Sequence, residues 1–373
     1  MGSPLRSQED FGPSLLIESH GGMGKIVAFT GFAKALRDFV KPGTTIHSRT
    51  SWPDVMRGNK DVSRFFDPNE LPPYFAEDHE KFEVLAGEPY NRLPYREGDE
   101  HIIASWCAMA GIPAPKEIRG YLRILEPEHR QALQVMRTVS KAGRWIAFQP
   151  WGGHGNPVQQ ARSLPVDIAQ EIVNKLAEKG YIVIQFSAPH EIQLEKTIRL
   201  DPGKDQQGNQ QAFEARTLFG IMNLCDGFVG IDSFGQHAWT ALGKKNGVVV
   251  WGATRPANLG YPTNRNLSAE TCPTPGCNRP SILGDMVGGR KPWTCPNGEK
   301  CMSAFSPGRI VEELESVNGW SGGAIGPVPP SHPLPSPQPV LALPVNPHVI
   351  PPEAGRPDVL TPDQVIPPGP GPK

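Results

Sequence analysis

The hexapeptide DSFGQH at residues 232–237 combines a predicted helix start with side chains that bind anions. It follows the apolar run GFVGI and precedes the amphipathic stretch AWTALG, which predicts a strand, a turn and a helix. Asp and Ser at a helix N-cap accept bonds from free backbone N–H groups, and the helix start favours a bound phosphate. We therefore expect these residues at a phosphate-bearing ligand: Asp232, Ser233, Gly235, Gln236 and His237. A plain capped helix with a packed histidine is the alternative.

Two other polar turns, HGGMGK at 20–25 and WGGHGNP at 151–157, also follow apolar runs. In an open parallel sheet, ligands bind at the carboxyl ends of the strands. We expect four glycines of these turns to lie near the same ligand: Gly21, Gly22, Gly152 and Gly153.

Four of the six cysteines fall within thirty residues, as CPTPGC and CPNGEKC. Thiolates in pairs on Pro- and Gly-rich turns suit a tetrahedral zinc or iron ion, although the commoner pairing leaves two residues between them. The sequence predicts a structural metal held by four ligands: Cys272, Cys277, Cys295 and Cys301. Free or redox-paired thiols are the alternative. A catalytic metal is not expected, because four thiolates leave no open position.

The apolar patterns that must position these residues alternate between strands and helices. Strands are predicted at 14–19, 44–50, 117–125, 144–150, 181–187, 227–232 and 247–253. Helices are predicted at 24–40, 99–112, 126–143, 164–180, 213–226, 234–243 and 306–317. Such an α/β order predicts parallel sheets covered by helices. We expect two Rossmann-like domains, residues 1–143 and 144–318, with a cysteine insertion at 272–301 and a ligand site between the domains.

The remaining segment, 319–373, is rich in the chain's 42 prolines and has no apolar period. It is expected to be a disordered tail, because it cannot bury enough surface to offset its ordering entropy. A net charge of −1 argues against a generally basic nucleic-acid binder. No signal peptide or run of roughly 18 apolar residues is present. We expect a cytoplasmic protein without a transmembrane segment, with peripheral contact at the inner membrane face as an alternative.

Over roughly residues 14–318, the order of these motifs resembles glycosyltransferase family 9, the ADP-heptose:lipopolysaccharide heptosyltransferase-like proteins of GT-B fold. That family carries Asp-Ser/Thr-Gly-x-x-His followed by a strand after a Leu-Gly-Lys turn. Here DSFGQH is followed by TALGKKNGVVVWGAT. The turns HGGMGK and DSFGQHAW also resemble those of bacteriophage-encoded relatives. A related family that modifies autotransporter proteins carries a four-cysteine iron site, which supports the metal prediction by analogy.

The resemblance implies a glycosyltransferase that holds a nucleoside-diphosphate sugar in its C-terminal domain and an acceptor in its N-terminal domain. The transfer would invert the sugar and need no catalytic metal. The acceptor implied is a lipopolysaccharide core glycan, with a protein or a hydroxylated DNA base as alternatives. Departing diphosphate needs positive charge or N–H donors, and the acceptor hydroxyl needs a base.

The sequence departs from the family at its first turn, where Gly24-Lys25 replaces a Gly-Asp pair whose Asp is the proposed base. We expect Lys25 to contact the diphosphate. The candidates for the base are His20, Glu18, Asp99 and His101, and His20 is preferred because it flanks the same turn and imidazole accepts a proton near neutral pH. Phe234 also stands where the family usually has glycine. A non-catalytic nucleotide- or glycan-binding protein of GT-B fold is the main alternative, and a GT-B epimerase is a weaker one.

Overall fold

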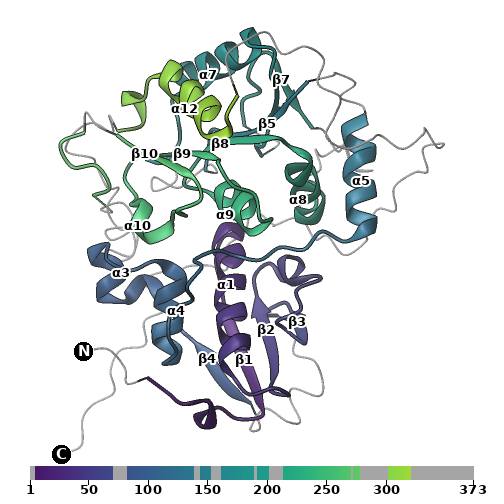
Figure 1. The fold of residues 1–373 in the computed structure, drawn as a ribbon, viewed down its shortest axis with the longest axis vertical. Coiled ribbons are helices and arrows are strands. Elements are labelled where there is room, and N and C mark those ends of the chain that lie inside the picture. The colour runs from purple at the N-terminus through teal and green to yellow at the C-terminus, as the bar shows by residue number, and fades with distance from the viewer. Residues whose placement is uncertain are drawn as a thin grey trace, which may run out of the picture. The chain divides into compact units, whose positions relative to one another are not determined.

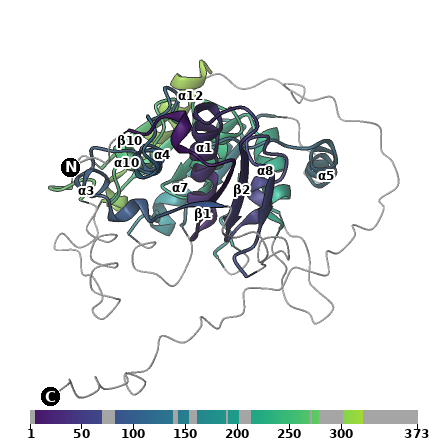
Figure 2. The same cartoon turned by 90° about the horizontal axis from the view of Figure 1, so that it is seen from below.

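The computed structural model describes residues 5–69, 82–137, 143–152, 161–188, 191–200, 213–269, 272–277 and 301–320. Residues 1–334 form one compact unit. This unit contains two parallel β-sheets with helices packed against them (Figures 1 and 2). The predicted α/β class with parallel sheets is confirmed.

The N-terminal sheet has the strand order β3-β2-β1-β4. Its strands are β1 (Ser14–Ser19), β2 (Thr45–Thr50), β3 (Arg64–Phe66) and β4 (Glu83–Ala86). Helix α1 (Met23–Phe39) follows β1, and its residues from 26 to 33 are all buried. Leu15, Ile17 and Ile46 from one face of the sheet join the same core cluster as this helix. Helix α4 (Ile102–Ala110) packs on α1 through the ring of Trp106.

The C-terminal sheet has the order β10-β9-β8-β5-β6-β7. Its strands are β5 (Trp145–Gln149), β6 (Ile182–Gln185), β7 (Thr197–Arg199), β8 (Gly227–Ile231), β9 (Val248–Trp251) and β10 (Arg265–Ser268). Side chains alternate between the two faces of a strand. Accordingly, Ile146 and Phe148 of β5 belong to one core cluster and Ala147 to another. Helices on both faces explain why the central strands β5, β8 and β9 are buried along their whole length.

Two helices cover each face of this sheet. Helices α7 (Val166–Glu178) and α12 (Pro307–Asn318) share a core cluster with one face. Helices α8 (Ala215–Leu224) and α9 (Phe234–Ala241) share the cluster of the other face. Short helices complete the described chain: α3 (Leu93–Glu97), α10 (Pro256–Leu259) and the 3-10 turns Gln8–Asp10, Pro53–Met56, Pro89–Asn91 and Met302–Ala304.

The strand predicted at 117–125 is wrong. This segment pairs with none of the described strands, because it runs between helices α1 and α9. The Leu122 N–H donates to the Ala241 carbonyl at 2.9 Å, and the Tyr121 N–H donates to the Thr30 hydroxyl at 2.7 Å. A Cβ on Gly120 would lie 2.5 Å from the Val27 carbonyl oxygen, so only glycine fits here. Close packing between two helices produced the apolar alternation that predicted a strand.

Helix α5 (Glu126–Arg137) precedes the predicted domain boundary at 143, yet it packs against α8. Arg216 of α8 is 2% exposed and donates to both carboxylate oxygens of Glu128 at 2.8 and 2.6 Å. Arg216 is therefore not part of the solvated surface. This arginine joins two helices. The division into two domains stays a prediction.

The predicted tail begins too early at 319. Gly319 closes α12 in a left-handed conformation, and the Trp320 ring packs on Tyr181, so both belong to the folded unit. The rest of the predicted tail, from residue 321, lies outside the described residues, as do Gly153 and Cys295. No described helix is long and apolar enough to cross a membrane.

Candidate functional site

The candidate site is built around the turn that links β8 to α9. Strand β8 lies in the middle of the C-terminal sheet, paired with β5 and β9, and all its residues are buried. Asp232 and Ser233 follow at its carboxyl end, and α9 begins at Phe234. The chain therefore places the predicted phosphate-binding residues at the edge of a parallel sheet where ligands usually bind.

Asp232 forms an ion pair across this edge. Its Oδ2 lies 3.2 Å from an Nη atom of Arg162, while its Oδ1 is buried with no hydrogen-bond partner among the described residues. The Asp232 side chain is almost fully buried, whereas that of Arg162 is 21% exposed. Arg162 thus brings a partly accessible cation to the turn. One signal for Arg162 is present in the sequence, a lone arginine just before the helix that follows the 151–157 turn.

The predicted capping of α9 by Asp232 and Ser233 is wrong. Neither side chain caps the helix, although Ser233 occupies the N-cap position. The Gly235 N–H instead donates to Oε1 of Gln149, at the end of β5, over 2.8 Å. Nε2 of Gln149 donates to the Ser233 hydroxyl at 3.2 Å. A buried glutamine from a neighbouring strand therefore takes the place of the local cap.

His237 is enclosed by protein. It is 4% exposed, and its Nδ1 lies 2.8 Å from the Tyr261 hydroxyl. Nε2 of Gln236 lies 3.2 Å from its other ring nitrogen and also donates to the Leu259 carbonyl. Burial lowers the pKa of His237 to about 4, against an opposing effect of Asp232. The ring is consequently neutral at pH 7, so it brings no charge to a phosphate.

The first glycine turn lies at the carboxyl end of β1. His20 is exposed, and Gly22 is the N-cap of α1. The Gly21 N–H donates to the Ser51 hydroxyl at 3.1 Å, and its carbonyl accepts from the Trp52 indole at 3.2 Å. Because φ of Gly21 is 122°, a side chain there would strain the turn.

Lys25 is engaged with a neighbouring carboxylate. Its Nζ lies 2.6 Å from Glu88, and it stands 4.8 Å above the ring of Tyr90. The lysine side chain is only 8% exposed, whereas that of Glu88 is 43% exposed. The Lys25 cation is thus paired inside the N-terminal half.

The two predicted turns meet at Gly24. A Cβ on Gly24 would lie 2.9 Å from Cδ2 of His237 and 3.0 Å from Cα of Phe234. Helices α1 and α9 therefore begin against each other, and glycine is required at their contact. The turn at 20–25 and the turn at 232–237 contribute to one region, as expected from the sequence order.

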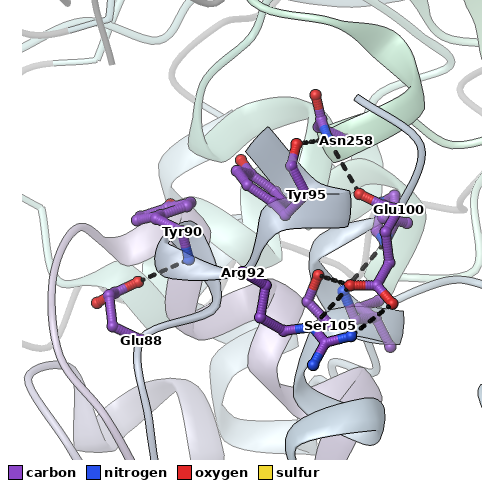
Figure 3. A network of polar contacts seen from close by, with 9 residues as sticks. Glu88, Tyr90, Arg92, Tyr95, Glu100, Ser105 and Asn258 are labelled. Atoms are coloured by element: carbon purple, nitrogen blue, oxygen red, sulfur yellow. Dashed lines mark hydrogen bonds and ion pairs between the residues drawn. The ribbon is translucent and has the colours of Figure 1, made fainter. Parts of the chain in front are cut away.

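A network of polar contacts in the segment between β4 and α4 borders this region (Figure 3). Arg92 forms two hydrogen bonds to Glu100, at 2.9 and 3.3 Å, and the Ser105 hydroxyl donates to the same carboxylate at 2.6 Å. The Asn258 amide, on α10, donates to the carbonyls of Tyr95 and Glu100 at 2.7 and 3.0 Å. Residues from both halves of the chain thus share one network.

Tyr95, labelled in Figure 3, was not predicted as a site residue. Burial raises its pKa well above the ordinary value, and the charges of Tyr90 and Asp232 add to the shift. The phenol consequently lies within electrostatic range of the Asp232 carboxylate. His101 at the start of α4 has its pKa lowered to about 3 by burial, with nearby His237 adding to the effect.

Two residues of the third turn, Trp151 and Gly152, are described, and both are engaged inside the protein. Trp151 is 6% exposed and its indole donates to the Leu164 carbonyl at 3.0 Å, so it is a core residue. The Gly152 N–H donates to the Ser163 hydroxyl at 3.2 Å. Asn264 serves a turn, because its N–H donates to the Tyr261 carbonyl and its amide to the Thr240 hydroxyl.

Three of the four clustered cysteines are described. Cys272 and Cys301 are buried in one core cluster, and Cys277 is half-buried. Within the described part of the chain, no group of three or more His, Cys, Asp or Glu side chains is arranged to hold a metal ion. The described cysteines alone therefore do not form a metal site.

Comparison with known proteins supports the fold. No model of a known protein family matches the sequence, and no curated protein matches it either. Among solved structures, a family 9 glycosyltransferase from Veillonella parvula superposes with a TM-score of 0.58 at 14% identity, covering 83% of this chain and 97% of its own. The iron-containing dodecameric glycosyltransferase TibC of enterotoxigenic Escherichia coli gives 0.55 at 12% identity, over 85% and 78%.

A third similar structure is E. coli ADP-heptose lipopolysaccharide heptosyltransferase II, with a TM-score of 0.54, 14% identity and coverage of 82% and 98%. The architecture is therefore that of the two-sheet α/β glycosyltransferases of GT-B type. Within that class, the fold of this chain is similar to that of family 9. At identities this low, the likeness concerns the fold alone.

Proposed function

We propose that this chain is a glycosyltransferase that moves a heptose-like or hexose sugar from a nucleoside-diphosphate sugar to an acceptor hydroxyl. The observation that carries the proposal is the partly exposed Arg162 cation, paired with buried Asp232 beside Ser233 and the start of α9. A solved complex of TibC contains ADP-D-β-D-heptose, and its fold is similar to this one at a TM-score of 0.53. That similarity supports a nucleotide-sugar donor here.

In the proposed reaction, the bond between the anomeric carbon and the donor phosphate oxygen breaks. The acceptor oxygen forms a bond to the opposite face of that carbon, so the configuration inverts. The nucleoside diphosphate leaves with the bonding electrons, and the acceptor proton passes to a base. Arg162, the Ser233 hydroxyl and the α9 dipole would stabilise the growing negative charge without a metal ion.

His237 and Gln236 have a positioning role in this proposal. Both ring nitrogens of His237 lie within hydrogen-bond distance of protein groups, and the neutral ring packs where α1 meets α9. It would set the position of the α9 start against the N-terminal half. Gly21 and Gly22 are proposed to lie beside the nucleotide-sugar donor. Lys25, which is paired with Glu88 at 2.6 Å, is proposed to contact the diphosphate.

His20 is the proposed base, because it is exposed at the end of β1 and imidazole accepts protons near neutral pH. The other sequence candidates fit less well. Glu18 is paired with Arg49, and His101 is buried with a pKa lowered to about 3. Asp99 is exposed at the end of α3 and stays a second candidate.

A non-catalytic nucleotide-binding protein is the second candidate function. The observation that favours it is Lys25, which stands where family 9 has an aspartate and is paired with Glu88. A screen of nucleotide sugars for hydrolysis and transfer separates the two. Released nucleoside diphosphate supports the enzyme, whereas binding without turnover supports the alternative. Neither binding nor turnover would contradict both.

The acceptor and the cysteines belong to the same proposal. We propose a glycan as the acceptor, with a protein or a modified DNA base as alternatives. We also propose a cytoplasmic location, with peripheral contact at the inner membrane face as an alternative. For the four cysteines we keep a structural zinc or iron site as a hypothesis, since Cys295 lies outside the described residues. Metal analysis of purified protein that finds neither zinc nor iron, with all thiols titratable, would contradict it.

A further inference from the structure

Gln149 is a buried polar residue at the end of an otherwise apolar strand. It is 3% exposed, and it contacts α9 twice. Its Oε1 accepts from the Gly235 N–H at 2.8 Å, and its Nε2 donates to the Ser233 hydroxyl at 3.2 Å. The two contacts join the carboxyl end of β5 to the N-terminus of α9.

The chemistry of these contacts fixes the orientation of the amide. A backbone N–H can only donate, so the oxygen of Gln149 must face Gly235. The NH₂ group must then face Ser233, and it too can only donate. The Ser233 oxygen is consequently an acceptor in this bond. Its own proton is directed away from Gln149, and Ser233 is partly exposed.

Gly235 has no Cβ, and this allows the close approach of the Gln149 side chain. A Cβ at this position would collide with Oε1 of Gln149 and lie 3.0 Å from the ring of Phe228. The glycine therefore serves the approach of Gln149 rather than the approach of a ligand. The Gly235 N–H is satisfied inside the protein and is not among the donors left for a phosphate.

We propose that Gln149 is a positioning residue that presents the Ser233 hydroxyl proton to the diphosphate of the donor. This inference rests on the proposed function, because it assumes a phosphate at Ser233. Gln149 itself does not touch the ligand. Gln149 accepts from the Gly235 N–H and donates to the Ser233 oxygen. The Ser233 proton is therefore directed toward the ligand, where it can donate to an anionic oxygen.

The test is a double-mutant cycle between Gln149→Met and Ser233→Ala. Methionine is neutral and similar in volume, but it neither accepts from Gly235 nor orients Ser233. Affinity is measured by calorimetry for whichever of ADP, UDP, GDP and CDP the unmodified protein binds most tightly. We expect Ser233→Ala to weaken binding roughly tenfold, as for a hydrogen bond to a charged group. Gln149→Met should weaken it about threefold, and the double variant roughly tenfold rather than thirtyfold.

Gln149→Glu reverses the direction of the hydrogen bond between residue 149 and the Ser233 hydroxyl. A carboxylate still accepts from Gly235, but it turns the Ser233 proton toward itself, so binding should weaken by at least roughly tenfold. Gln185 on the adjacent strand β6 offers a matched control. It is also 3% exposed, and it accepts from the Leu194 N–H at 3.0 Å and donates to the Ser187 hydroxyl at 3.1 Å. Gln185→Glu and Gln185→Met should leave nucleotide affinity within about twofold.

Melting temperatures of all variants separate loss of fold from loss of orientation. Additive effects of Gln149→Met and Ser233→Ala, or equal losses for the Gln149 and Gln185 variants, would overturn the inference while leaving the proposed function intact. A protein that binds none of the four nucleoside diphosphates and none of their sugars would overturn both.

Discussion

At the scale of single residues, the candidate site depends on buried groups whose charge state is set by their surroundings. His237 and His101 are both enclosed, and burial lowers their pKa values to about 4 and about 3. Among the described residues, one oxygen of Asp232 has no partner, and Arg162 supplies an accessible charge. The site thus combines neutral imidazoles with the Arg162 cation, which suits binding of an anion more than proton transfer at His237.

The depressed pKa of His237 predicts a pH dependence of stability. An unfolded histidine has a pKa of about 6.5, so between pH 6.5 and about 4 the unfolded state binds more protons than the folded state. Stability therefore falls as the pH is lowered through this window. His237→Gln removes this group. Between pH 7 and pH 5, the free energy of unfolding should therefore fall less in this variant than in the unmodified protein, by about 2 kcal/mol.

Urea unfolding at the two pH values measures this difference. An equal fall in stability for His237→Gln and the unmodified protein would show that His237 is not buried as a neutral ring.

At the scale of elements, the contact between α1 and α9 is the feature that brings the two predicted turns together. Gly24→Ala would place a methyl group 2.9 Å from His237 and 3.0 Å from the α9 backbone. We expect a loss of about 1–3 kcal/mol in the free energy of unfolding, together with weaker nucleotide binding, because backbone cannot move aside cheaply. Gly12→Ala, with nothing within 4 Å, should change stability little. Unaltered stability in Gly24→Ala would contradict this packing.

The ion pair between α5 and α8 makes a second prediction at this scale. Arg216→Met leaves the Glu128 carboxylate buried without its partner, which should cost about 3–5 kcal/mol in urea unfolding. Arg130→Met removes an exposed pair with Glu126 and should cost less than about 1 kcal/mol. Equal effects of the two substitutions would mean that Arg216 is not buried in solution.

Elements with strong apolar patterns could be predicted from the sequence, and those formed by long-range pairing could not. Helices α1, α7 and α12 and strands β5, β8 and β9 lie within a few residues of their predicted bounds. Strands β3, β4, β7 and β10 were missed, because they are three or four residues long and form by pairing with a neighbour. Segment 117–125 was misassigned, because packing between helices produces the same alternation as a strand.

The site residues likewise divide into those that local sequence could predict and those that only the fold brings together. The turn at 232–237 was located by its place after an apolar strand, which depends on local sequence. Its partners Arg162, Gln149 and Tyr95 come from other elements, and only the fold brings them near. For two of them the sequence contained a signal: Gln149 is a polar residue at the end of an otherwise apolar strand, and Arg162 is a lone arginine just before a predicted helix.

At the scale of the whole molecule, one core cluster contains residues from both sheets, including Ile17 of β1 and Phe228 of β8. Residues 1–334 form one compact unit. We therefore expect a single cooperative unfolding transition for both sheets, because exposing the α9 face would leave apolar surface of both halves in water. Far- and near-ultraviolet circular dichroism should give the same urea midpoint. Two separated midpoints would instead support independently stable domains.

A donor diphosphate is proposed to bind beside Arg162. Calorimetric affinity of the unmodified protein and of Arg162→Gln for nucleoside diphosphates tests it most directly. We predict measurable binding of at least one nucleoside diphosphate and a loss of at least roughly tenfold in Arg162→Gln, the scale of one lost contact to a charged group. Arg265 of β10 is paired with Glu313 of α12, and the control variant Arg265→Gln should bind nucleoside diphosphates normally. Equal affinity of Arg162→Gln and the unmodified protein would contradict the account.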